Sequence, residues 1–246
     1  VFMGPERRSV VIPEEARKRT AYHEAGHALV AAVLPHAEKV HKITITPRGR
    51  AMGLTWYLPD ERHSYSLHEF QARIAMAMGG RVAEELIFGP ENVTSGAASD
   101  IQQVTRIARA MVTQFGFAEE LGYVDYANEQ QSHLGAYGGG TSHSAATQKI
   151  IDDKVKELVD EGYDTAKRIL TEKKDDLHRL AQGLLEYETL TGSDIQKVLK
   201  GEPLDKGDDD APTGGETVSV TAIPKTAKPR RPSSEGDGGM EPEPSA

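Results

Sequence analysis

The chain has 246 residues, a net charge of −9 and no cysteine, so disulfides and thiolate metal sites are excluded. Neither half of the chain is basic, and nucleic acid is therefore not expected as a partner. No apolar run approaches the ~20 residues that a membrane-spanning helix needs, and no signal-peptide pattern opens the chain. We expect a soluble chain, and its start at Val1 rather than at methionine indicates a fragment.

The composition changes near residue 200. Residues 201–246 hold 7 of the 13 prolines and 7 of the 24 glycines, with ten acidic against five basic side chains. Such a segment buries too little apolar surface to offset the entropy that is lost on ordering. We therefore predict a disordered tail over 201–246, a folded domain over 13–200, and a short junction over 1–12 that leads into the domain.

The folded part opens with a helix and a hairpin. Pro13, followed by two glutamates, begins a helix that runs to Leu34 and is stopped by Pro35. The stretch 40–58 then alternates β-branched and polar residues in "KITIT", turns at "PRGR" and continues in "GLTWYL". This pattern predicts a β-hairpin.

The rest of the folded part is predicted to be helical, which makes the fold class mainly α with a small β-hairpin or sheet beside the first helix. Ser66 and Glu69 form a capping-box pattern at the start of a helix that ends near Gly89. The glycine-containing stretch "GAYGGGTS" is interpreted as a loop. Further helices are expected from Ser99 or Asp100 to Gly116, over two long stretches between 144 and 190, and from a cap at Thr191 to Lys200.

The first helix contains the sequence "HEAGH" at residues 23–27. His23 and His27 are four residues apart, so their imidazoles point to one face of a helix and can share one zinc ion. Glu24 lies about 100° around the helix, where it can reach a zinc-bound water without being a ligand. This H-E-x-x-H arrangement predicts a zinc hydrolase in which the zinc-bound water attacks a peptide carbonyl and Glu24 serves as general base and then acid. The alternative is a partly exposed helix with two solvated histidines.

Zinc needs a third protein ligand, while the fourth position is left for water. Metzincin spacing would require histidine where Val33 stands, so the third ligand must come from a distant segment. Asp100 follows a loop of small residues and is favoured over Glu84 and Glu85, which can equally form ion pairs or support the ligands. Asp100 can also be a helix N-cap. The remaining histidines are isolated and are interpreted as surface or loop residues: His36, His41, His63, His68, His133, His143 and His178.

Gly26 lies in the middle of the motif helix, where alanine would be favoured by roughly 1 kcal/mol. A glycine there indicates that another backbone comes close to the helix. That backbone is either a ligand-bearing segment or a substrate strand beside the zinc, or a neighbouring helix that packs through Gly79 and Gly80. If nothing approaches, replacing Gly26 by alanine would be mildly stabilising.

Several motifs in the same order resemble the peptidase domain of the FtsH family. They are "MGPERRS", "TAYHEAGHALVA", "HKITITPRGRAMGLTWYLPDE", "GGRVAEELIFGPENVTSGAASDIQQVTRIARAMVTQFGF" and "LLEYETLTGSDI". The resemblance covers about residues 1–200 and leaves the tail outside. Members of this family are bacterial, membrane-anchored, ATP-dependent zinc proteases.

The resemblance implies that Asp100 is the third ligand of one zinc ion per chain, with Glu84 and Glu85 as supporting or structural residues. It also implies a homo-hexamer that degrades unfolded or misassembled membrane and cytosolic proteins, delivered by an AAA+ ATPase at the cytoplasmic face of the bacterial inner membrane. The G-x-x-x-x-G-K-[ST] phosphate loop does not occur in this sequence. ATP would therefore act only through a module that this chain lacks, and residues 1–12 would be the junction with that module.

The predicted hairpin offers a place for an extended substrate. Zinc peptidases commonly hold a substrate as an added strand on a sheet edge, and either "ITITP" or "GLTWYL" can supply that edge. Trp56 and Tyr57 are equally candidates for packing and for substrate contact. Two rival readings are a non-catalytic helical assembly module and an unrelated zinc hydrolase. The intact His23, Glu24 and His27 argue against the first, and the agreement along about 200 residues argues against the second.

Overall fold

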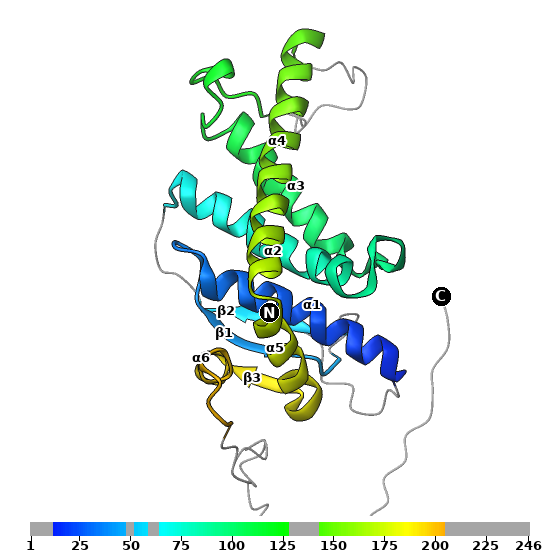
Figure 1. Ribbon diagram of the computed structural model, residues 1–246. Helices are drawn as coiled ribbons and strands as arrows, with labels where there is room; N and C mark the ends of the chain where they lie inside the picture. The colour runs from blue at the N-terminus through cyan, green and yellow to red at the C-terminus, as the bar shows by residue number, and fades with distance from the viewer. Residues whose placement is uncertain (1–11, 48–51, 59–63, 128–142, 205–246) are drawn as a thin grey trace, which may run out of the picture. The chain divides into compact units, whose positions relative to one another are not determined.

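Helices dominate the computed structural model, which describes residues 12–47, 52–58, 64–127 and 143–204 (Figure 1). These residues belong to one compact unit that extends to Leu204. In chain order the elements are α1 (Glu14–Val33), β1 (Val40–Thr44), β2 (Leu54–Tyr57), α2 (Leu67–Phe88), the 3-10 turns η1 (Pro90–Asn92) and η2 (Ser95–Ala97), α3 (Ala98–Thr113), η3 (Glu119–Leu121), α4 (Ala145–Glu172), α5 (Lys174–Tyr187), β3 (Thr189–Thr191) and α6 (Gly192–Lys200).

Some sequence predictions fall outside the described residues. They are the junction residues 1–11, the "PRGR" turn after Pro47, the "GAYGGGTS" loop at 135–142, His63, His133 and the tail residues 205–246. Among the described residues, the mainly α fold class with a small sheet is confirmed. Within the same residues, no helix combines the length and the apolar character needed to cross a bilayer.

Helix α1 is the central element of the domain. Almost every residue from Ala21 to Ala31 is buried, because α2, α5 and the strands β1 and β2 all pack around the helix. A helix that is covered on all sides is a core helix rather than a surface helix. The "HEAGH" motif therefore lies inside the domain, on a helix whose position is fixed by packing against several neighbouring elements.

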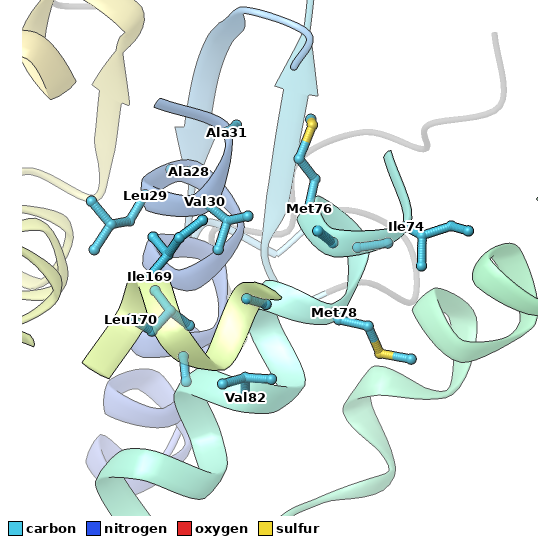
Figure 2. Close-up of a cluster of buried hydrophobic side chains, with 14 of the residues drawn as sticks. Ala28, Leu29, Val30, Ala31, Ile74, Met76, Met78, Val82, Ile169 and Leu170 are labelled. Carbon is cyan, nitrogen blue, oxygen red and sulfur yellow. The ribbon is translucent and has the colours of Figure 1, made fainter. Parts of the chain in front are cut away.

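The core joins α1, α2 and α4. Leu29 of α1, Ile74 and Val82 of α2, and Ile169 and Leu170 of α4 are each at most 2% exposed. Figure 2 shows Val82, Ile169 and Leu170 near one another where the helices meet, with Ile74 farther along α2. Each fully buried aliphatic side chain contributes about 1.5–3 kcal/mol of transfer free energy. This packing fixes α1 and α2 relative to each other, which matters because both helices contribute to the site described below.

The sheet has the strand order β2-β1-β3, and both pairings are antiparallel. The predicted hairpin is confirmed as β1 and β2, with Ile43 opposite Thr55. Because β1 is paired on both sides, the prediction that "ITITP" supplies a free edge is wrong for the residues of this strand. Strand β2 is an edge strand among the described residues, which leaves "GLTWYL" as the candidate edge.

Strand β3 was not expected from the sequence. Its three residues are too few to produce a recognisable alternation of polar and apolar side chains. The strand is held by β1, more than 140 residues earlier in the chain, where Ile43 lies opposite Leu190 and the hydroxyls of Thr44 and Thr189 are 2.8 Å apart. Only this long-range pairing defines it as a strand.

The predicted helices are present, with small corrections at their ends. Capping boxes at Ser66 and Thr191 are confirmed. Helix α3 begins at Ala98 rather than at Ser99 or Asp100 and ends at Thr113, and its N-cap is Ala97. The alternative in which Asp100 is an N-cap is therefore wrong, because Asp100 lies in the first turn of the helix. Its carboxylate is consequently free to point toward α1.

Gly26 and Gly79 form the contact between α1 and α2. A Cβ added to Gly26 would collide with the carbonyl oxygen of Gly79 and would lie 2.7 Å from the Cβ of Ala83, while a Cβ added to Gly79 would lie 2.7 Å from the oxygen of Gly26. The two backbones touch without an intervening side chain. The helix-packing interpretation of Gly26 is therefore correct, and the approach of a ligand-bearing segment or a substrate strand at this residue is not what the glycine accommodates.

We expect Gly26→Ala to destabilise the domain, contrary to the mild stabilisation that helix propensity alone would give. Overpacking of this kind costs about 1–3 kcal/mol, against a helix-propensity gain of roughly 1 kcal/mol, and here the obstacle is backbone that cannot rotate away. Urea unfolding followed by circular dichroism measures the difference.

The matched control for this substitution is Gly183→Ala in α5. The nearest atoms that a Cβ at Gly183 would meet are side-chain atoms of Leu190 and Val198, the closest at 3.3 Å. If Gly26→Ala proves as stable as Gly183→Ala, the glycine contact does not constrain the two helices.

Candidate metal centre

Helix α1 directs two imidazoles to the same point. The Nε2 atoms of His23 and His27 are 3.1 Å apart, and the two side chains are only 13% and 8% exposed. One helical turn separates the two residues, so the convergence follows from helix geometry. The alternative of two solvated histidines is wrong.

Asp100 joins the two imidazoles from the start of α3. Its Oδ2 lies 3.2 Å from Nε2 of His23 and 3.5 Å from Nε2 of His27. Ligand atoms around a tetrahedral zinc ion lie about 3.3 Å apart when each zinc–ligand bond is about 2.0 Å. The three observed separations match that spacing, so these side chains fit a tetrahedral zinc ion with one position left open.

The Nδ1 atom of each imidazole, on the side away from the cluster, is hydrogen-bonded to a residue of α2. Nδ1 of His27 is 2.8 Å from the carbonyl oxygen of Met76, and Nδ1 of His23 is 2.9 Å from Oε1 of Glu84. A carbonyl oxygen can only accept, so Nδ1 of His27 carries a proton, and in the neutral ring the lone pair is then on Nε2. Carboxylate and carbonyl partners of this kind fix the orientation and the tautomer of metal-binding histidines.

Glu84 also anchors the segment that leads to Asp100. Its Oε2 accepts hydrogen bonds from the backbone N–H of Thr94 at 3.0 Å and from the Thr94 hydroxyl at 3.1 Å. One carboxylate therefore orients His23 and fixes the loop before α3. Glu85 points elsewhere, to Arg81 at 3.1 Å and to the hydroxyl of Tyr163. Of the two glutamates, Glu84 supports the cluster and Glu85 ties α2 to α4.

The cluster attracts positive charge. Burial by itself would lower the pKa of His23, but hydrogen bonds to Asp100 and Glu84 and the charge of Glu24 outweigh burial and raise the pKa to about 10. Burial would raise the pKa of Asp100, but its hydrogen bonds with the two imidazoles lower that pKa instead. Two lone-pair nitrogens and a carboxylate held this close repel one another unless a proton or a metal ion lies between them.

Glu24 lies beside the cluster and is held by β2. The residue is 6% exposed, and its Oε2 accepts a hydrogen bond of 2.6 Å from the hydroxyl of Thr55. A Cβ added to Gly53 would lie 2.6 Å from Oε1 of Glu24, so the backbone at Gly53 packs directly against the carboxylate. Burial raises the pKa of Glu24 and the charges of His27 and His23 oppose that rise, and a raised pKa suits a carboxylate that must take up a proton.

A cleft of about 1090 Å³ runs past these residues, bordered by α1, α2, β2 and the beginning of α3. Gly53, Leu54, Thr55 and Tyr57 line it along β2. Tyr57 therefore borders the cleft, whereas the ring of Trp56 packs under the ammonium group of Lys42, 4.4 Å from its centroid. The cluster of His23, His27 and Asp100 and the sheet edge consequently line one solvent-accessible space.

The four residues that the sequence predicts for the site lie together in the structure: His23, Glu24, His27 and Asp100. Among residues 12–47, 52–58, 64–127 and 143–204, the set of His23, His27 and Asp100 is the one group of three potential ligands whose ligand atoms converge. Sequence reasoning missed Thr55, Thr94 and the carbonyl of Met76. No spacing rule links these residues to the motif, because Thr55 and Met76 contact it from β2 and α2 and Thr94 contacts it only through Glu84.

A comparison with protein families places this geometry in context. The model of peptidase family M41 matches residues 10–198. This chain belongs to peptidase family M41. The chain is 51% identical over 227 residues to the ATP-dependent zinc metalloprotease FtsH of Caulobacter vibrioides, a match that covers 91% of the chain and 36% of that relative. The FtsH protein of Rickettsia bellii is 44% identical over 235 residues, which is 93% of the chain and 37% of the relative.

A eukaryotic relative shows the same partial coverage. The mitochondrial inner membrane i-AAA protease supercomplex subunit YME1 of Saccharomyces cerevisiae is 45% identical over 207 residues, covering 84% of the chain and 26% of that protein. The chain thus spans about a third of the length of these relatives. The family match and the relatives together confirm the prediction of a peptidase domain of the FtsH zinc metalloprotease family.

For this M41 domain we expect the two acids beside His23 to differ in their effect on zinc affinity. Asp100→Ala removes one of the three potential ligands and should weaken zinc binding by more than about 100-fold, whereas Glu84→Ala removes a partner that orients His23 and should weaken it about 10- to 100-fold. Competition with a chromophoric chelator measures both constants.

Glu85→Ala provides the control, since Glu85 contacts Arg81 and Tyr163 rather than the cluster, and it should bind zinc as the unchanged chain does. A greater loss for Glu84→Ala than for Asp100→Ala would exclude Asp100 as the third ligand.

Proposed function

We propose that this chain is a zinc metalloendopeptidase domain in which His23, His27 and Asp100 hold one zinc ion and Glu24 is the catalytic base. The convergence of the three ligand atoms at spacings of 3.1–3.5 Å carries this proposal. When bound, zinc supplies a Lewis acid that polarises the scissile carbonyl and makes water a nucleophile near neutral pH.

The side chains of this domain supply the remaining chemistry. Glu24 takes the proton of the attacking water and then delivers it to the nitrogen of the leaving amine. Thr55 holds Oε2 of Glu24, which leaves Oε1 as the oxygen that exchanges the proton. Glu84 and the carbonyl of Met76 hold the imidazoles in the orientation that presents both Nε2 atoms.

Strand β2 is the proposed docking edge for the substrate. An extended peptide can add to β2 as a further antiparallel or parallel strand, which provides backbone hydrogen bonds with little demand on sequence. Support comes from the cleft, which β2 lines through Gly53, Leu54, Thr55 and Tyr57. A peptide on this edge passes directly beside Glu24, because Thr55 of the same strand is hydrogen-bonded to that carboxylate.

In the full-length protein, we propose that this domain works with an AAA+ module, assembles as a homo-hexamer and degrades unfolded or misassembled membrane and cytosolic proteins. The names of the relatives, which include an ATP-dependent protease and an i-AAA protease subunit, support the ATPase partner. The proposed location is the cytoplasmic face of a bacterial inner membrane, with residues 1–12 as the junction to the ATPase, residues 13–200 as the peptidase and residues 201–246 as a tail. ATP would act through that module alone.

The decisive test compares Glu24→Gln with the unchanged chain on casein or an unstructured fluorogenic peptide. Loss of the proton-accepting oxygen should reduce hydrolysis by at least about 100-fold while the zinc content per chain stays the same. Glu85→Gln is the matched control and should remain active. Equal activity of both glutamate variants, or a chain that binds no zinc, would contradict the proposal and favour a non-catalytic assembly module.

A second test addresses Thr55. Thr55→Val keeps the shape and the β-branching of the side chain but removes the hydrogen bond to Glu24, so kcat should fall about tenfold or more, the range for a lost hydrogen bond to a charged group. KM and zinc content should stay unchanged, and Thr55→Ser should retain most of the activity. If Val and Ser at this position behave alike, the hydroxyl does not hold the base.

A further inference from the structure

We propose that Gly80 is an essential part of the metal centre although it contributes no ligand: the absence of a side chain at this position allows both imidazoles to converge. This inference rests on the proposed zinc site and adds a residue to it. A Cβ added to Gly80 would lie 2.6 Å from Nε2 of His23 and 2.6 Å from Nε2 of His27, and 2.5 Å from Cε1 of His23. The added atom would thus meet the two nitrogen ligands at once.

The position of Gly80 follows from the register of the two helices. The carbonyl of Met76 holds Nδ1 of His27, and the carboxylate of Glu84 holds Nδ1 of His23. Met76, Gly80 and Glu84 are spaced by four residues, so they lie along one face of α2. One ring is therefore hydrogen-bonded one turn before Gly80 and the other one turn after it. The Nε2 atoms of both rings lie beside Gly80, which is midway between these two contacts.

A methyl group at position 80 is incompatible with this arrangement. Contacts of a Cβ shorter than 3.0 Å are essentially never seen, so each nitrogen at 2.6 Å would have to retreat beyond the about 0.2 Å tolerance of zinc–ligand distances. The atoms that the added Cβ would meet are the ring ends of the His23 and His27 side chains. The metal-free protein can relieve the clash by turning the rings, but a protein with both nitrogens on zinc cannot.

The neighbouring glycine provides a contrast of a different kind. A Cβ on Gly79 would meet backbone atoms of α1, with the carbonyl oxygen and carbon of Gly26 at 2.7 and 2.9 Å. Backbone cannot turn aside, so Gly79 is required for the helix contact itself. Two adjacent glycines of α2 therefore serve two separable purposes, one in folding and one in metal binding.

The test measures zinc affinity and metal-free stability for the 246-residue chain and for Gly80→Ala and Gly79→Ala. We expect Gly80→Ala to bind zinc about 100-fold more weakly or worse, at or beyond the upper range for residues that orient ligands, with a thermal midpoint after chelation no lower than that of the unchanged chain. Gly79→Ala should lower that midpoint. An unchanged chain that binds no zinc would refute the proposed function, whereas equal zinc affinity of the unchanged chain and Gly80→Ala would overturn this inference alone.

A further comparison decides the matter if Gly80→Ala is itself unstable. The substitution is repeated in a chain that carries His23→Ala and His27→Ala, where the rings that would clash are gone. If Gly80→Ala is neutral or stabilising there, the clash is with the imidazoles and the inference stands. If it destabilises both backgrounds equally, Gly80 serves only the packing of α2, and the inference is wrong.

Discussion

The contact between the backbones of α1 and α2 at Gly26 and Gly79 is the constraint on which the rest of the site depends. Any side chain at either position would separate the helices, because a Cβ on Gly79 would already lie 2.7 Å from the Gly26 oxygen. Only at this separation can a backbone carbonyl of α2 reach the ring of a histidine on α1, as Met76 does at 2.8 Å. Close helix packing is thus a requirement of the proposed metal centre and not merely of the core.

The polar groups of the site come from four segments of the chain. Helix α1 provides two imidazoles and a carboxylate, α2 provides Glu84, the loop after α2 provides Thr94, and α3 provides Asp100. The side chains of the cluster are mostly buried, and their nitrogen and oxygen lone pairs face one another. A positive charge among them, either a proton or a metal ion, therefore lowers the energy of the site. The raised pKa of His23 and the lowered pKa of Asp100 are two expressions of that same requirement.

The edge strand joins recognition to catalysis in the proposed enzyme. Strand β2 lines the cleft and also holds the carboxylate of Glu24 through Thr55. Its partner β1 is fixed on the other side by β3, at the end of the folded chain. The geometry of the base therefore depends on a sheet whose strands come from both ends of the domain, so the base is placed by tertiary contacts and not by α1 alone.

The sequence by itself determined the local features of this protein: the helices and their capping boxes, the hairpin, and the pair of histidines one turn apart with Glu24 beside them. These depend on propensities and spacings within a few residues, which a linear pattern records. The sequence also narrowed the candidates for a third ligand to Asp100, Glu84 and Glu85. Only the resemblance to a family favoured Asp100 strongly.

Tertiary structure alone decided the remainder. It separated Asp100 as a potential ligand from Glu84 as a support and Glu85 as an ion-pair partner, although the two glutamates are adjacent. It revealed β3, the hydrogen bond of Thr55 to Glu24, and the backbone contact that requires glycine at positions 26 and 79. Apart from the i,i+4 ion pair of Glu85 with Arg81, these features depend on distances between residues that are 31 to 149 positions apart. Those distances are set by how α1, α2, α3 and the sheet pack, which no periodicity along the chain encodes.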